Sequence, residues 1–175
     1  CIMKRLYLFI PVLLFAFFFC SNSSAQSAFL KFDGVDGESS DASHKGWIDV
    51  LSFSQGASKP GGASTGLSRR RGSALLEDFV ITKKLDKTSP KMADFLLKGR
   101  IIPTVTLELV NSGKSPYYKV VMSNVIINSF KNGGTCGNQC PVTEEISLSF
   151  ERITWTYIDA SGSITTSTYS VEKGM

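Results

Sequence analysis

The chain has 175 residues, of which 42% are hydrophobic and 19% are charged, and its formal net charge is +4. A chain of this length is expected to form one domain, whose core is large enough to fold without a metal or a disulfide. The small net charge argues against nucleic acid as a partner, because nucleic-acid-binding domains carry a dense basic surface.

Residues 1–25 are predicted to be a signal peptide. Lys4 and Arg5 precede an apolar run over residues 6–19. This run is shorter than the roughly 20 residues that a membrane-spanning helix needs. The small residues Ser-Ser-Ala come next and predict cleavage before Gln26.

A second cleavage site lies before Ala28. An uncleaved anchor and lipoprotein processing at Cys20 are the alternative interpretations, although the three phenylalanines before Cys20 do not suit lipoprotein processing. With cleavage, residues 26–175 form the mature domain, which is secreted and keeps no stable membrane anchor. Its net charge is +2, because the signal peptide removes two basic residues and no acidic one.

From residue 26 onward, the residue pattern is mostly that of β-strands. The β-rich or alternating runs predict strands over residues 28–33, 47–54, 78–84, 101–110, 117–122, 125–130, 145–159 and 164–171. A bulge or turn at Ser123 and Asn124 is compatible with one long bent strand over 117–130. The turn at residues 160–163 predicts that the last two strands form a hairpin.

One helix interrupts the strands after residue 84. Ser89 is predicted as its N-cap and Pro90 as its first helical residue. Gly99 is predicted to end it, one residue after Lys98. Its apolar face is formed by Met92, Phe95 and Leu96. The fold class is therefore mainly β, an antiparallel barrel or sandwich with one short α-helix.

Two cysteines remain after the signal peptide, Cys136 and Cys140, in a loop rich in Gly and Asn. A disulfide between them is predicted, because an exported chain meets an oxidising compartment. A zinc site would need four ligands, and the other candidate ligand is one distant histidine. A thioredoxin-like motif has two residues between its cysteines, whereas this loop has three.

A long Gly- and Ser-rich segment covers residues 55–73 and contains Lys59 and the run Arg69, Arg70 and Arg71. Loops of this length inside a domain are usually functional or disordered. Three interpretations of the arginines stay open. They form a solvated loop tip, they dock onto an acidic patch of a neighbouring copy, or they contact nucleic acid or membrane.

The sequence contains no arrangement of residues typical of an enzyme. His44 is the single histidine and lies in a polar loop, and there is no nucleophile elbow, P-loop or dinucleotide fingerprint. We interpret Asp78, Asp86, Glu144 and Glu145 as ordinary acids at strand ends. No catalytic, cofactor-binding or metal-ligating residue is therefore predicted.

Three stretches carry a family resemblance: FLKFDGVDGESSDASHKGWIDVLSFSQG, FVITKKLDKTSPKM and EEISLSFERITWTY. In this order they resemble the haemolysin-coregulated protein (Hcp) family, the tube protein of type VI secretion. With the paired C-terminal strands, the resemblance covers about residues 28–171. It implies a small antiparallel β-barrel with one helix on its flank.

The resemblance also implies an assembly. Hcp-like subunits form hexameric rings with a wide lumen, and the rings stack into a tube inside a contractile sheath. A spike sits at the tip of the tube, and effector proteins are carried in the lumen. The segment 55–73 corresponds to an extended loop that contacts neighbouring subunits, so Lys59, Arg69, Arg70 and Arg71 are expected at an inter-subunit contact.

The predicted signal peptide departs from the family, whose tube proteins assemble in the cytoplasm and ordinarily carry no export signal. Two hypotheses follow from this. The chain is a structural tube subunit, either of a secretion apparatus or of an extracellular tubule built on the same ring. Alternatively, it is an exported monomeric or single-ring binding protein that recruits a protein or a glycan.

Overall fold

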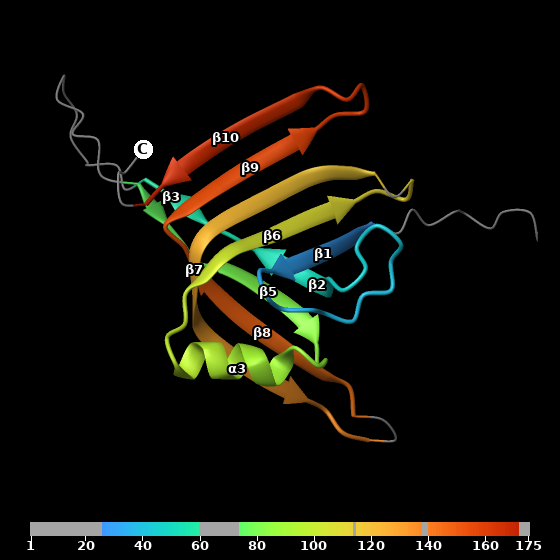
Figure 1. The fold of residues 1–175 in the computed structure, drawn as a ribbon, viewed down its shortest axis with the longest axis vertical. Helices are drawn as coiled ribbons and strands as arrows, with labels where there is room; N and C mark the ends of the chain where they lie inside the picture. Colours follow the sequence, from blue (N-terminus) through green and yellow to red (C-terminus); the bar gives the residue numbers. More distant parts are fainter. Residues whose placement is uncertain (1–25, 60–73, 114, 138–139, 172–175) are drawn as a thin grey trace, which may run out of the picture.

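A computed structural model describes residues 26–59, 74–113, 115–137 and 140–171, so the predicted signal peptide lies outside the described residues (Figure 1). The described residues form ten strands and one helix. In chain order these are β1 (Ser27–Phe32), β2 (Ile48–Ser54), β3 (Ala57–Ser58), β4 (Leu75–Leu76), β5 (Phe79–Lys84), α3 (Ser89–Leu97), β6 (Ile102–Val110), β7 (Pro116–Gly134), β8 (Val142–Ser149), β9 (Arg152–Ile158) and β10 (Ile164–Ser170).

The main sheet is antiparallel and has the strand order β10-β9-β7-β6-β1-β2-β5-β8, with β8 also pairing to β7. Six strands therefore close into a barrel, and the β9–β10 hairpin extends the sheet beyond it. We call this hairpin the wing (Figure 1). The predicted barrel with one short helix is confirmed.

Strand β7 makes this arrangement possible because it is 19 residues long. Its first half pairs with β6 and β9, and its second half pairs with β8. Between the halves, Asn124 has a φ of 52°, in the left-handed region that Asn tolerates better than most residues. The register to β8 shifts between Ile127 and Ser129. The two runs predicted at 117–122 and 125–130 are thus one bent strand.

The barrel interior is filled by apolar side chains from its six strands, from β9 and from α3. In β6, for example, Val105 and Leu107 are fully buried, and Ile146 and Leu148 of β8 are equally buried. Burial of one such side chain contributes about 1.5–3 kcal/mol relative to its exposure. Because the strands alternate, every second side chain points into the barrel, and the burial of these apolar side chains drives the barrel to close.

The single strand predicted over residues 145–159 is wrong, since the chain bends between β8 and β9. The bend lies at Phe150 and Glu151, and the Glu151 N–H donates to the Ser123 carbonyl across the bend in β7. Phe150 and Ile153 are both buried, although they have opposite parity in the chain. The sequence alternation puts residues 152, 154 and 156 on the same side of one strand as residues 146, 148 and 150. Arg152 is exposed, so this side of β9 does not face the core.

The predicted N-cap is also wrong. The N-cap of α3 is Thr88, which makes no side-chain capping bond, and Ser89 is the first helical residue. The Ser89 hydroxyl instead donates to Glu144 Oε2 at 2.7 Å. The C-terminal prediction is confirmed, because Gly99 has a φ of 59°. The amides of Gly99 and Arg100 donate to Leu96 and Phe95, which is the Schellman arrangement.

A buried ion pair explains why Ser89 does not cap the helix. Lys83 and Glu144 face each other across β5 and β8, and both are 0% exposed. Lys83 Nζ lies 2.7 Å from Glu144 Oε2, 2.8 Å from Asp86 Oδ1 and 3.1 Å from Ser89 Oγ. Glu144 and Asp86 are therefore not ordinary strand-end acids, because they fix the start of α3 to the barrel wall.

The Asp86 carboxylate is ionised in this cluster. Burial by itself would raise its pKa, but the hydrogen bonds from Lys83 and Thr88 outweigh burial and leave the pKa below its ordinary value. The cluster therefore holds one cation between two anions, and the Ser89 hydroxyl and the Lys84 carbonyl satisfy further bonding positions.

We predict that Lys83→Met will destabilise the protein by about 3–5 kcal/mol, because it leaves Glu144 buried without its cation. Lys83→Met combined with Glu144→Leu should recover most of this loss, since both fully buried charges are then removed and the remaining carboxylate of Asp86 is only partly buried. Lys31→Met is the matched control, because it breaks the exposed Lys31–Asp36 pair and should cost less than about 1 kcal/mol. Urea unfolding followed by circular dichroism measures all three. Equal costs for Lys83→Met and Lys31→Met would contradict the role of the pair.

Candidate subunit interface

The wing leaves one strand edge uncovered. In the described part of the chain β10 pairs only with β9, and residues 164–168 are exposed along its length. Natural edge strands are usually protected by charged residues, proline or bulges. The β10 sequence ITTSTYS contains no charge and no proline. An unprotected edge of this kind is suited to pairing with another chain.

One face of the wing is a ladder of threonines. The hydroxyls of Thr154 and Thr168 lie 3.0 Å apart, and those of Thr156 and Thr166 lie 3.3 Å apart. Such cross-strand pairs fix the register of the hairpin. The predicted turn at residues 160–163 is present, and Asp159 Oδ1 accepts backbone N–H groups within it.

The opposite face of the wing is aromatic. Tyr157 is 51% exposed and faces Tyr118 of β7 across the sheet. Trp155 and Tyr169 on the same hairpin are partly buried. Ile164 at the start of β10 lies on the threonine side of the hairpin and is 65% exposed. Aromatic residues beside an uncovered edge are typical of association surfaces, because they bury large apolar areas.

The base of the long loop is attached to this face. Residues 55–73 were predicted as a linker, but β3 pairs with β4 and so brings the two ends of the loop together. The Trp155 indole donates to Gln55 Oε1 at 3.0 Å, which links the loop base to the wing. Lys59 is exposed at this base. Arg69, Arg70 and Arg71 lie outside the described residues.

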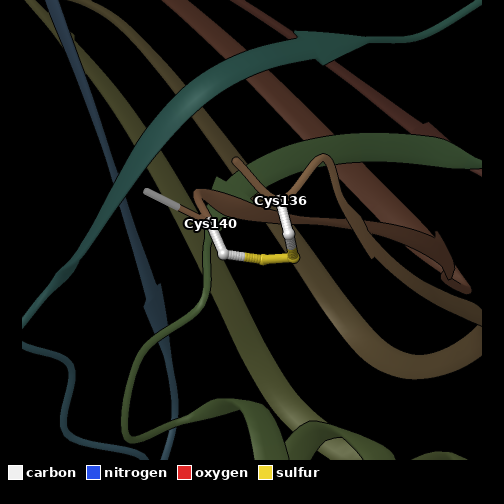
Figure 2. The surroundings of a disulfide bond; sticks show 2 residues. All are labelled: Cys136 and Cys140. Atoms are coloured by element: carbon white, nitrogen blue, oxygen red, sulfur yellow. A yellow bond between two sulfur atoms is a disulfide. The ribbon is translucent and has the colours of Figure 1, made fainter. Parts of the chain in front are cut away.

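The predicted cysteine pair lies elsewhere on the molecule. Cys136 and Cys140 are joined by a disulfide (Figure 2). Their Cα atoms lie 4.1 Å apart. The bond closes the turn just beyond the last pairing of β7 with β8, between Gly134 and Val142. The wing pairs with the other end of β7, so the predicted residues fall at two separate places.

The described residues hold no group of three or more His, Cys, Asp or Glu side chains arranged to bind a metal ion. Within the same residues, no helix has both the length and the apolar character needed to cross a membrane.

Comparison with known proteins identifies the family. Residues 29–157 match the family model described as type VI secretion system effector, Hcp. The chain belongs to the Hcp family. It is 29% identical over 132 residues to Protein hcp1 of Pseudomonas aeruginosa, and the aligned region covers 74% of this chain and 81% of that protein.

Two solved structures with similar folds support the same assignment. One is described as the structure of a type six secretion system protein, with a TM-score of 0.79, 28% identity and coverage of 86% of this chain and 99% of that chain. The other is Hcp1 from Salmonella typhimurium, with a TM-score of 0.72, 26% identity and coverage of 85% and 97%. The resemblance drawn from the sequence is therefore confirmed. As an Hcp-family protein the chain is a tube subunit of the type VI secretion system, a family whose structures form hexameric rings.

We predict that Ile164→Lys will weaken self-association at least about tenfold without unfolding the protein. Its side chain is 65% exposed in the monomer, so the folded chain loses little, but a neighbour packed on β10 would have to bury the new charge. Leu97→Lys is the matched control, because Leu97 is 84% exposed on α3, away from the wing (Figure 1). Sedimentation velocity over a concentration series compares the two variants. Wild-type association of Ile164→Lys would exclude the wing from the interface.

Proposed function

We propose that this chain is a structural subunit whose wing closes six copies into a ring, and that the rings stack into a hollow tube. The observation that carries the proposal is the unprotected β10 edge on an otherwise closed barrel, in a member of a ring-forming family. A head-to-tail contact between different surfaces closes into a ring when its rotation allows, whereas ring-on-ring contacts remain open and build a filament.

The wing supplies two different contact types at one place. Its edge offers backbone N–H and C=O groups to a neighbour, and its aromatic face offers apolar area around Tyr157. Backbone pairing gives affinity and side-chain contacts give specificity, so the combination defines one orientation of the neighbour. This supports a ring contact of fixed geometry better than a surface for many different partners.

A structural role, rather than an enzymatic one, also accounts for the buried polar side chains. Lys83 and Glu144 neutralise each other inside the barrel wall, and the Ser89 hydroxyl accepts a hydrogen bond from Lys83 and donates one to Glu144 Oε2. These groups lie away from solvent, with 0–4% of each residue exposed, and hold the barrel in shape. Effector proteins in the lumen, a surrounding sheath and a spike are the further partners that this function requires.

We also propose that the chain is exported through a cleaved signal peptide and works outside the cell. Hcp proteins are secreted proteins of the type VI system, which supports an extracellular location. The Cys136–Cys140 bond supports an oxidising compartment. The tube is then either the secretion tube itself or an extracellular tubule built from the same ring.

A second candidate is an exported monomeric or single-ring protein that keeps the fold and recruits a protein or a glycan. The disulfide at the tip of the β7–β8 hairpin favours it, because a tube assembled in the reducing cytoplasm has no need of that bond. Stacked rings in electron micrographs of the purified protein would support the tube, and single particles at high concentration would support the binding protein.

Deleting residues 59–71 should leave the barrel and its rings intact but weaken stacking. The ends of the deleted segment are already close, because Ser58 and Leu75 pair across β3 and β4. Ordering a free loop costs about 1–2 kcal/mol per residue, which a receiving neighbour would offset.

Replacing Arg69, Arg70 and Arg71 with Ser should give a milder defect that depends on salt. Light scattering and electron microscopy measure ring and tube populations separately. A deletion variant that stacks like wild type would remove the loop from the contact.

In protein secreted by its native host, we expect the N-terminus at Gln26 or Ala28 and a bond between Cys136 and Cys140. Intact-mass spectrometry with and without reduction detects both features. Replacing both cysteines with Ser should cost at most about 2 kcal/mol, because the bond closes a short loop outside the barrel. An unprocessed N-terminus, or two free thiols in the secreted protein, would contradict the export proposal.

A further inference from the structure

A second uncovered edge lies in the barrel wall, where β1 and β2 part. The two strands pair over three residues only, from Leu30 opposite Ile48 to Ala28 opposite Val50. Beyond Val50, residues 52–54 of β2 continue to pair with β5 on the other side. Within the described ranges, residues 51–54 have no strand partner on the β1 side. This stretch, LSFS, therefore has a free backbone edge of the same kind as β10.

The two strands part at a bulge. The register of β2 against β5 shifts between Val50 and Ser52, so Leu51 is an extra residue without a partner in β5. A bulge bends its strand and re-aims its side chains. Leu51 is 53% exposed, and Phe53 is 37% exposed although its ring stacks on the buried Phe79. The bulge thus presents apolar side chains beside the free edge.

The gap between the two strands is a hollow of about 330 Å³. Its lining comes from β1, β2, β6 and β7 together with the residue before β1, and it contains no charged side chain: Gln26, Ser27, Ala28, Val50, Leu51, Ser52, Phe53, Leu109 and Tyr117. We call residues 51–54 and this hollow the slot. A strand that docks in the slot would not have to desolvate a charged side chain there, which is the main cost of burying a polar surface.

We propose that the slot receives the β10 edge of the neighbouring copy. This assignment rests on the ring proposed above and names the surface that the wing meets. A head-to-tail contact joins two different surfaces of the same chain, so the wing needs an acceptor other than a second wing. The β10 sequence ITTSTYS is as free of charge as the slot. Backbone pairing between the two edges would continue the sheet from one copy into the next.

The positions of the two edges in the sheet suit such a contact. Strands β9, β7, β6 and β1 lie between β10 and β2 in the strand order. The wing edge and the slot therefore stand at opposite ends of one run of strands. Each copy offers one edge of each kind, so every copy can give its wing to one neighbour and take the wing of another.

A mixing experiment with two variants tests the pairing. Leu51→Lys alters the slot and Ile164→Lys alters the wing, and both side chains are more than half exposed, so both variants should fold. Each variant alone should associate at least about tenfold more weakly than wild type, because every contact would bury a new charge. In an equal mixture they should form heterodimers, since the intact wing of Leu51→Lys fits the intact slot of Ile164→Lys. Ile101→Lys, at a position beyond α3 that is 57% exposed, is the matched control and should associate like wild type.

Sedimentation velocity of each variant and of the mixture separates the outcomes. Weak association of Ile164→Lys together with normal association of Leu51→Lys would keep the wing in the ring contact and overturn the slot. Normal association of Ile164→Lys would overturn the wing and the slot together. An equal mixture that forms no heterodimer would show that the two edges do not meet, and would also overturn the proposal.

Hydrogen exchange on the wild-type protein supplies a readout that needs no variant. On assembly, amides of residues 51–54 that point away from β5 should gain at least about tenfold protection. Amides of β6 should not change, because β6 pairs with β1 and β7 within the monomer. Unchanged exchange at residues 51–54 in assembled protein would overturn the proposal. If Leu51→Lys does not fold, this measurement decides.

Discussion

The structure depends on one strand that is too long for the barrel it closes. The 19 residues of β7 bend at Asn124, so that its two halves face different neighbours. The second half pairs with β8 and completes the barrel, whereas the first half pairs with both β6 and β9. Closure of the barrel and the projecting wing are therefore two results of the same bend.

The bend in β7 divides the strands of the main sheet into those that have two neighbours within the monomer and one that keeps a whole edge unpaired. Within the barrel each strand has two neighbours, and the buried Lys83–Glu144 pair fixes α3 across its wall. In the wing, β10 has a single neighbour among the described strands and no charge to protect its edge. A backbone edge left in this state favours a partner strand, and a further copy of the chain supplies the simplest one.

Much of the fold could be predicted because its signals are local. Alternating apolar residues identified the strands, and Pro90 and Gly99 placed the helix within one residue of its position. The cysteine pair was predictable because only three residues separate its members. The break between β8 and β9 was missed, although Phe150 and Ile153 are both apolar at opposite parity and carried the signal for it.

The polar clusters could not be predicted, because their members meet only in the folded chain. His44 and Glu108 are 64 positions apart, and Ser89 and Glu144 are 55 apart. No pattern in the sequence relates such residues, so Ser89 was assigned to the nearer role of a helix cap. The arginines of the long loop remain a prediction, since they lie outside the described residues.

Hydrogen exchange at β10 tests directly whether copies of the chain meet at the edge of the wing. The amides of residues 164–170 would be measured on protein below and above the concentration at which it assembles. The ring account predicts that assembly protects alternate β10 amides, those on the edge away from β9, while α3 amides do not change. Assembly that leaves β10 exchange unchanged would show that the wing edge is not where the copies meet.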